Sequence, residues 1–315
     1  APRLHSPQSM DDFLTIFDTP EADIRRMLER AAALRRKPEP GLLSGKTLCC
    51  LFEKPSLRTR VSFEQAMRRL GGTAMSMHNT EIGIGGREAP EDIARVLGSM
   101  VDAVMVRVVL HATLTRMADA VEVPVVNGLS ELAHPAQALA DALTLMDEFS
   151  PGDPAGLRGR KVSYVGDANN VARSLAEICG KLGMHFCICS PPGYEFGNGS
   201  LDRLRRAHPG SRFETCTDPV EAVLHADAIY CDTFVSMGQE HEMTERLAAF
   251  ARYQVNERLV SQAPEHAIVL HCLPAHRGVE ITSEVLDGPR SRVFRQARNR
   301  LDAQMGLLAL LVGGA

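Results

Sequence analysis

The chain has 315 residues, a length that allows one large domain or two of ordinary size, and two is the better expectation. Hydrophobic residues make up 44% of it and charged residues 23%, which is typical of a well-packed globule and excludes a disordered or collagen-like chain. The formal net charge of -4 gives no overall attraction to nucleic acid or to an anionic membrane, so neither is expected as a partner.

No apolar run approaches the roughly 18–20 residues that a membrane-spanning helix needs. The first residues, Ala-Pro-Arg-Leu-His, contain no apolar signal core, so export is not expected. The eight cysteines form no C-x-x-C pair and most lie inside apolar runs, which predicts free thiols in a cytoplasmic protein. No His/Cys cluster has the spacing of a structural zinc site, so no metal is expected.

Short apolar runs alternate with amphipathic stretches along the whole chain. The apolar runs predict nine strands, at 47–52, 73–78, 103–109, 124–129, 161–165, 185–189, 212–216, 228–234 and 267–273. Helical patterns lie between them, near 57–70, 90–100, 135–148, 170–182, 219–226 and 241–253. This alternation predicts an α/β protein of two domains, each a parallel sheet flanked by helices.

A turn-rich stretch from Ser150 to Gly156 follows a long helical pattern. We place the domain boundary there, which gives one domain at 1–149 and another at 150–315. The last helical pattern, at about 297–312, is strongly apolar and could pack on either domain.

Ligands of open parallel sheets bind beyond the carboxyl ends of the strands, so the residues after each strand deserve inspection. After the strand at 47–52, Ser56 is a natural N-cap for a helix whose first turn holds Arg58 and Arg60. The helix dipole disfavours cations there by about 0.3–1 kcal/mol. Arginines in this place, beside the hydroxyls of Ser56 and Thr59, favour a phosphate-type anion site over a plain capped helix with solvated arginines.

Arg107 closes a strand that is otherwise apolar, where an arginine is commonly a residue of the sheet rim. His134 precedes Pro135, which occupies the favoured first position of the next helix. His134 and Gln137 are three residues apart and share one face of its first turn. A capping histidine and a ligand-binding histidine are equally compatible with this pattern.

The second half of the chain offers polar residues after three further strands. In the loop after the strand at 161–165, one glycine, Gly166, precedes Asn169 and Asn170, which is too few for a dinucleotide-binding motif. Either asparagine could cap a helix or bind a ligand. Asp232 and Ser236 follow another strand and suit an amino group. Cys272 ends the last strand, where it could pack, contact a ligand or act as a nucleophile.

A cysteine hydrolase is a competing interpretation of Cys272, and it would need a histidine base within reach. His271 is adjacent in sequence, so on a strand we expect it to point to the opposite face.

Four motifs occur in register: Ser-Leu-Arg-Thr-Arg at 56–60, His-Pro-Ala-Gln at 134–137, Asp-x-x-x-Ser-Met-Gly at 232–238 and His-Cys-Leu-Pro at 271–274. Together they resemble those of the aspartate/ornithine carbamoyltransferase family, and the likeness extends over nearly the whole chain. The resemblance implies a carbamoyl-phosphate domain followed by an amino-acid domain, in a homotrimer or a multiple of trimers. For its ornithine branch it implies carbamoyl transfer from carbamoyl phosphate to the δ-amine of L-ornithine, giving L-citrulline and phosphate, with no metal or organic cofactor.

The resemblance also implies a role for individual residues. Carbamoyl phosphate would be bound by Ser56, Leu57 through its backbone, Arg58, Thr59, Arg107, His134, Gln137, Cys272, Leu273 and Arg300. L-Ornithine would be bound by Asn170, Asp232, Ser236 and Met237. The catalytic set would be Arg58, Arg107, His134, Asp232 and Cys272.

Two positions depart from the family pattern. Leu57 stands where the family usually has a second hydroxyl, so a phosphate contact worth about 1.5–3 kcal/mol is lost unless another group replaces it. Leucine there resembles relatives that use N-acylated ornithine, but those lack the Ser-Met-Gly loop. Gly83 stands where a neighbouring subunit normally supplies a polar side chain, with Arg87 as an uncertain substitute.

Other functions are compatible with the same motifs. The acceptor amine could be putrescine or N-acetylornithine, which a substrate panel would separate from ornithine. A catalytically silent paralogue is a further alternative. Retention of Arg58, Arg107, His134, Cys272 and Arg300 argues against it, because a silent subunit has no need of all five.

Overall fold

The structure is a computed structural model that describes residues 11–314 except 198 and 237. The chain forms two compact units. The first holds the chain up to Leu143 and again from Arg298 onward, and the second is Thr144–Ala297. The sequence placed the boundary in the turn after residue 149, whereas the two divisions fall inside the long helices α6 (Pro135–Phe149) and α13 (Val293–Leu311).

The first unit is built on a four-stranded parallel sheet with the order β2-β1-β3-β4. Its strands are β1 (Thr47–Phe52), β2 (Thr73–His78), β3 (Ala103–Arg107) and β4 (Val125–Leu129). Every residue of β3 is buried, as is every residue of β1 after Thr47. Such continuous apolar strands are typical of parallel sheets that helices cover on both faces.

Helices connect these strands and pack on them. They are α1 (Glu21–Arg36), α2 (Leu57–Arg69), α3 (Asn79–Ile82), α4 (Pro90–Gly98) and α5 (His111–Asp119). Helix α2 packs on β1 and β2, α4 packs on β3, and α5 packs on β4. Buried side chains of α4 and α5, among them Ile93 and Leu114, form a core cluster with strand residues such as Val104.

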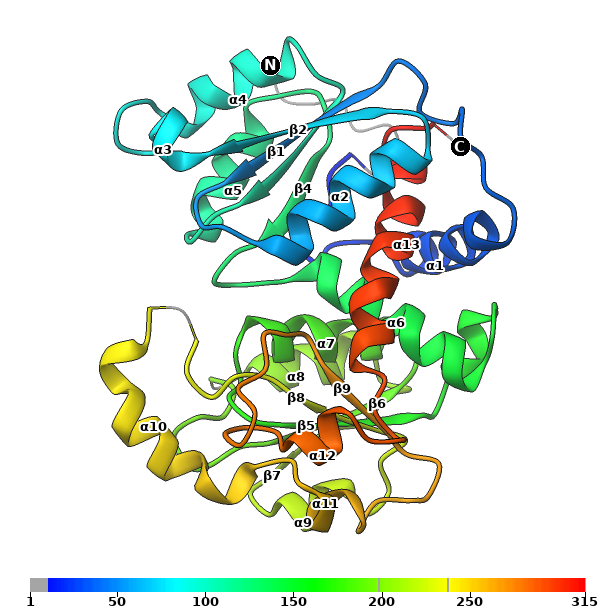
Figure 1. Ribbon diagram of the computed structural model, residues 1–315, viewed down its shortest axis with the longest axis vertical. Coiled ribbons are helices and arrows are strands. Elements are labelled where there is room, and N and C mark those ends of the chain that lie inside the picture. The colour runs from blue at the N-terminus through cyan, green and yellow to red at the C-terminus, as the bar shows by residue number, and fades with distance from the viewer. Residues whose placement is uncertain (1–10, 198, 237, 315) are drawn as a thin grey trace. The chain divides into compact units, whose positions relative to one another are not determined.

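The sequence analysis missed α1, the longest helix before α13 (Figure 1). Its signals are present: acidic residues in the first turn, Arg35 and Arg36 in the last, and buried apolar residues at helical spacing. Helix α1 lies beside α13, where Arg35 bonds to Asp302 at 2.9 Å and to Asn299 at 3.0 Å. This places α13 in the first unit from Arg298 onward.

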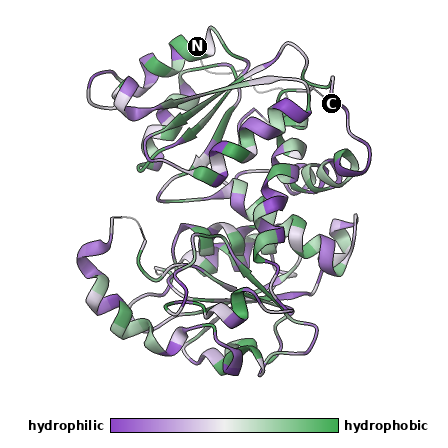
Figure 2. Cartoon of the chain, viewed as in Figure 1, coloured by the Kyte–Doolittle hydropathy of each residue, from purple (hydrophilic) through white to green (hydrophobic). Residues whose placement is uncertain are grey.

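The second unit is built on a five-stranded parallel sheet with the order β7-β6-β5-β8-β9. Its strands are β5 (Lys161–Val165), β6 (His185–Cys189), β7 (Phe213–Cys216), β8 (Ala228–Cys231) and β9 (Ile268–His271). Its helices are α7 (Asn170–Lys181), α8 (Ser200–Ala207), α9 (Pro219–Val223), α10 (Met243–Phe250), α11 (Glu257–Val260) and α12 (Ser283–Leu286), with three short 3-10 turns, Pro154–Leu157, Glu240–Glu242 and Ala251–Tyr253. Figure 2 shows that the strands are mainly hydrophobic, whereas the helices carry hydrophilic residues as well.

The predicted fold class is confirmed, and all nine predicted strands are present. Three of them end earlier than expected, so Val108, Asp232 and Cys272 lie just past the carboxyl ends of their strands. Within the described part of the chain, no helix combines the length and the apolar character needed to cross a membrane.

A bulge between β3 and β4 sets the position of Arg107. The pairing shifts there, so that Arg107 pairs with Leu129 and Gly128 is passed over. A Cβ atom on Gly128 would lie 2.3 Å from the sulfur of Met105 and 3.4 Å from the Cβ of Arg107. Glycine is therefore required for the two strands to approach this closely, as bulges beside functional sites commonly need.

Substitution of this glycine tests the role of the bulge. We expect Gly128→Ala to lower the free energy of unfolding by about 1–3 kcal/mol, because the buried Met105 must move to admit the methyl group. Urea denaturation gives the measurement. Gly41→Ala is the matched control, since a Cβ there meets nothing within 4 Å; equal stability of the two variants would contradict the close approach at Gly128.

Candidate active site

The carboxyl edge of the first sheet brings together the segments that the sequence singled out. Arg107, the last residue of β3, pairs with Phe52 at the end of β1. The chain that leaves β1 reaches Ser56, which is the N-cap of α2 and accepts a hydrogen bond from the backbone N–H of Thr59 at 3.4 Å. The predicted cap is thus confirmed, and it places Arg58 and Thr59 in the first turn of α2.

Buried hydrogen bonds join three elements of the first unit. Arg300 of α13 donates to the Thr59 hydroxyl of α2 at 3.0 Å and to the side-chain oxygen of Gln137 of α6 at 2.9 Å. The amide group of Gln137 donates in turn to Asp141 at 2.8 Å. All four side chains are buried, so this network fixes one end of the Arg300 guanidinium within the protein.

His134 lies among positive charges. It is buried directly before α6. Burial and the charges of Arg300, Arg107 and Arg58 hold the pKa of His134 well below its usual range. The imidazole is therefore neutral at physiological pH, and its one N–H makes it a hydrogen-bond donor rather than a cation.

Arg107 is held in a similar environment. Burial, and after it the charge of Arg58, lower the pKa of Arg107 to about 10. Its buried Nε has no hydrogen-bond partner among the residues that the structure describes. A buried guanidinium repelled by the half-buried Arg58 is unfavourable unless an anion compensates the charges, so this cluster is suited to binding a dianion such as a phosphate ester.

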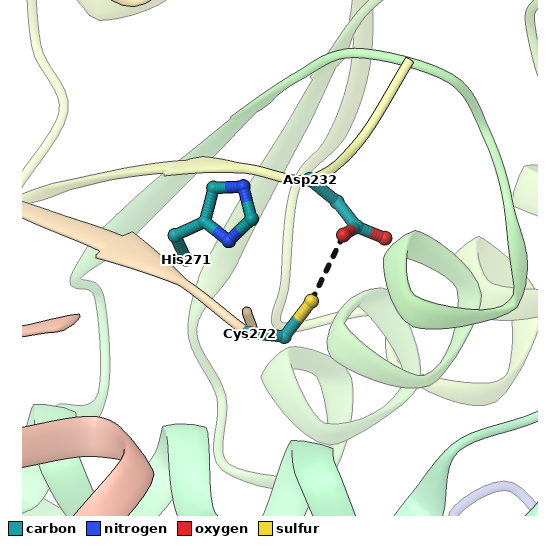
Figure 3. A group of neighbouring side chains, drawn as sticks. All are labelled: Asp232, His271 and Cys272. Carbon is teal, nitrogen blue, oxygen red and sulfur yellow. Dashed lines mark hydrogen bonds between the residues drawn. The ribbon is translucent and has the colours of Figure 1, made fainter. Parts of the chain in front are cut away.

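A second cluster lies at the carboxyl edge of the five-stranded sheet. The register aligns the ends of β5, β8 and β9 through Val165, Cys231 and His271. The residues that follow two of these ends meet: the thiol of Cys272 donates to Asp232 at 3.0 Å (Figure 3). Both side chains are buried.

The other carboxylate oxygen of Asp232 accepts from Asn169 at 2.8 Å. Asn169 is also the N-cap of α7, where its side-chain oxygen accepts from the backbone N–H groups of Val171 and Ala172. The sequence left the cap open between two asparagines, and the structure assigns it to Asn169. Asn170 becomes the first residue of α7 and is half-buried.

Of the remaining predicted residues, the structure describes Ser236, Cys272 and Leu273. Ser236 is half-buried, and its backbone N–H donates to the side chain of Gln239 at 3.0 Å. Met237 lies outside the described residues. Cys272 and Leu273 belong to the second unit, and their contact with carbamoyl phosphate stays a prediction.

His271 does not turn away from Cys272 as the strand geometry predicted. Polar atoms of Asp232, His271 and Cys272 all lie within 4.8 Å of one another, because β9 ends at His271 and the chain turns (Figure 3). His271 is nevertheless not placed as a base for the thiol. Its Nδ1 accepts from the backbone N–H of Leu273 at 2.8 Å and its Nε2 faces Glu280 at 3.3 Å. These bonds also leave no free imidazole lone pair for a metal ion.

The two departures from the family pattern have different surroundings. Leu57 is 75% exposed, so its side chain takes no part in the core. Gly83 has φ +74° and is the left-handed C-cap of α3. Arg87 donates to the backbone oxygen of Glu81 at 3.4 Å.

Sequence reasoning missed several polar residues around both clusters. Asp141 had a detectable signal, because it lies four residues after Gln137 inside an apolar helix. Glu280 had none: it is fully buried, but its sequence neighbours resemble those of any loop.

Both halves of the chain match known proteins of one family. Residues 11–147 match the family model "Aspartate/ornithine carbamoyltransferase, carbamoyl-P binding domain", and residues 158–311 match its "Asp/Orn binding domain". An ornithine carbamoyltransferase of Bacillus subtilis is 45% identical over 96% of this chain and 93% of its own length. The solved ornithine carbamoyltransferase of Pyrococcus furiosus is 43% identical, with a TM-score of 0.92 over 99% of this chain and all of the other. A solved acetylornithine transcarbamylase is 28% identical, with a TM-score of 0.85 over 96% and 99% of the two chains.

The lowered pKa of His134 predicts a pH effect on stability. Below the unfolded-state pKa of about 6.5, the unfolded chain binds a proton that the folded chain does not. The free energy of unfolding therefore decreases as the pH is lowered. Between about pH 7.5 and about pH 5.5 we expect the wild type to lose about 1 kcal/mol more than His134→Gln in urea denaturation. His111, whose pKa burial also lowers, is common to both proteins and cancels. An equal loss in both would show that His134 is not held neutral.

Proposed function

The chain belongs to the aspartate/ornithine carbamoyltransferase family, and we propose that it transfers the carbamoyl group of carbamoyl phosphate to the δ-amine of L-ornithine, giving L-citrulline and phosphate. The observation that carries the proposal is the cluster of Arg58, Arg107 and Arg300 around a neutral, buried His134. The ornithine carbamoyltransferases similar to this chain match over nearly its full length, which supports the same reaction.

We assign one substrate to each part of the chain. Residues 1–149 would bind carbamoyl phosphate and residues 150–315 would bind ornithine, with Arg300 returning to the first unit on α13. The family descriptions matched by the two halves support this division. By analogy with the family we also propose that the protein acts as a homotrimer or a multiple of trimers.

The phosphate would bind at the start of α2. Ser56, Arg58, Thr59 and the backbone N–H of Leu57 lie where the helix dipole and the free N–H groups favour an anion. A dianion there would relieve the repulsion that lowers the pKa of Arg107. Binding is thus driven by charges that the folded protein already holds in place.

Three groups would stabilise the developing charge on the carbonyl oxygen. Thr59, Arg107 and the neutral His134 can each donate to that oxygen, and one such donor is typically worth about 2.7–4 kcal/mol in the barrier. Gln137 and Arg300 would orient the carbamoyl group, since their mutual hydrogen bond fixes both side chains. A neutral imidazole serves here as a donor that keeps its proton.

The acceptor amine must be deprotonated before it attacks. An amine with a pKa near 10.4 costs about 4–5 kcal/mol to deprotonate at pH 7. Asp232 would bind the α-ammonium group of ornithine, whereas the buried surroundings of Cys272 would disfavour the ammonium form of the reacting δ-amine. A C–N bond then forms, the C–O bond to phosphate breaks, and the phosphate accepts the amine proton.

The proposal also specifies which amine receives the carbamoyl group. Asp232 and Ser236 belong to the Asp-x-x-x-Ser-Met-Gly motif, which supports L-ornithine, as does the higher identity to ornithine carbamoyltransferases than to the acetylornithine enzyme. We expect a citrulline assay with carbamoyl phosphate to give product with ornithine and none with putrescine or N-acetylornithine. Product with another amine would change the acceptor, and no product at all would favour a silent paralogue.

Removal of one guanidinium tests the anion cluster. We expect Arg107→Ala to lower kcat about 100- to 1,000-fold, because a donor to the developing oxyanion is lost. Arg58→Ala should reduce turnover as well, by weakening phosphate binding. Arg60→Ala is the matched control, since Arg60 lies on the same helix turn but is exposed and paired with Glu64 at 2.9 Å. Wild-type turnover in both Arg58→Ala and Arg107→Ala would refute the site.

A second substitution tests the division of substrates between the two units. We expect Asp232→Asn to raise KM for ornithine about 10- to 100-fold, because a charge-assisted hydrogen bond to an ammonium group is lost. KM for carbamoyl phosphate should stay at the wild-type value. Asp202→Asn, which changes an exposed carboxylate of the same unit, controls for the charge. Equal effects on the two substrates would contradict the assignment.

A further inference from the structure

His271 and Glu280 form a buried pair that none of the roles above uses. Their side chains are fully buried, with Nε2 of the histidine 3.3 Å from Oε1 of the glutamate. Burying a carboxylate is costly unless hydrogen bonds compensate it. Glu280 also accepts from the backbone N–H of His276, whose Nδ1 lies 3.6 Å from its second oxygen. The carboxylate therefore ties the loop after Cys272 back to β9.

The hydrogen bonds of His271 fix its tautomer. The backbone N–H of Leu273 donates to Nδ1 at 2.8 Å, so Nδ1 must carry a lone pair. The ring proton is then on Nε2, where it points to Glu280. A hydrogen bond at one ring nitrogen that fixes the protonation of the other nitrogen is a common way to orient an imidazole.

The bond to Leu273 holds an unfavourable backbone. Leu273 has φ +59°, a left-handed conformation that is unfavourable for a residue with a side chain. The residue before Cys272 is fixed as well, because the backbone N–H of His271 donates to Gln296 at 2.9 Å, and Gln296 donates to Tyr230 at 3.1 Å. Both chain neighbours of Cys272 are thus held from inside the second unit.

We propose that His271 and Glu280 are positioning residues that set the backbone at Leu273 and thereby aim the Cys272 thiol at Asp232. The imidazole transfers no proton and touches no substrate. Glu280 keeps the histidine in the tautomer that can accept from Leu273. The effect on turnover rests on the proposed function, because it matters only if Asp232 and Cys272 hold the acceptor amine.

Two variants of His271 separate its two hydrogen bonds. His271→Asn places a carbonyl oxygen at the δ position, where it can accept from Leu273. His271→Gln reaches the ε position near Glu280 and leaves the Leu273 N–H without its acceptor. His185→Asn is the matched control, because Nδ1 of His185 also accepts a backbone N–H, that of Arg212 at 3.0 Å, at the start of β6.

Steady-state kinetics give the first measurement. We expect His271→Gln to lower kcat about 100-fold, the scale of a small misplacement of reacting groups, and His271→Asn to stay within about 10-fold of the wild type. KM for carbamoyl phosphate should change less than kcat in both variants, since its proposed phosphate ligands lie in the first unit and only Cys272 and Leu273 are predicted to contact it from the second. The His185→Asn control should retain wild-type kcat. A structural role alone predicts equal losses in the two His271 variants.

Alkylation of Cys272 by iodoacetamide, located by mass spectrometry, gives a second measurement that needs no turnover. We expect His271→Gln to react about 10-fold faster than the wild type, as a thiol freed from one hydrogen bond would, and His271→Asn to react at the wild-type rate. The half-buried Cys216 is the internal reference. A wild type that makes no citrulline would refute the proposed function but leave this result to decide the positioning role. Equal alkylation rates in the two variants would overturn it.

Discussion

Repulsion between buried positive charges is the constraint on which the first unit depends. Burial, and after it the charges of Arg300, Arg107 and Arg58, lower the pKa of His134, and burial together with the charge of Arg58 lowers the pKa of Arg107. Such an arrangement opposes folding in the absence of a ligand. It persists because helices, strands and the bulge at Gly128 fix the backbones that carry these side chains. We infer that an anion bound there would be recognised mainly by electrostatics that exist before it binds.

The second unit contains a buried carboxylate instead of a cluster of positive charges. Asp232 is buried, yet both of its oxygens already accept hydrogen bonds, from Cys272 and Asn169. Asn169 is itself fixed as a helix cap, so the carboxylate is presented in one orientation. We infer that the charge of an ammonium group would let it compete with these two donors for the carboxylate. The two units thus differ in what surrounds the predicted ligand-binding residues: neighbouring positive charges in the first, and a carboxylate that accepts two hydrogen bonds in the second.

Much of this arrangement could be predicted from the sequence. Apolar runs located all nine strands. Residues at or just after the strand ends, such as Arg107 and Asp232, could be named because ligands bind parallel sheets at that edge. Other features could not. The choice of Asn169 over Asn170 as cap depends on backbone angles that two identical residues do not reveal. Helix α1 precedes the first strand, so it lies outside the strand–helix alternation that predicted the other helices. Glu280 pairs with His271, nine residues before it, because of a turn that the sequence does not reveal.

The discontinuous course of the first unit has a consequence for how the chain matures. Arg300, which bonds to Thr59 and Gln137, lies far beyond them in the chain and is synthesised after the whole second unit. During translation, the first sheet therefore emerges without the Arg300 guanidinium, which joins it only after α13 has left the ribosome. The hydrogen bonds that Arg300 makes to Thr59 and Gln137 can thus form only after the second unit has been synthesised.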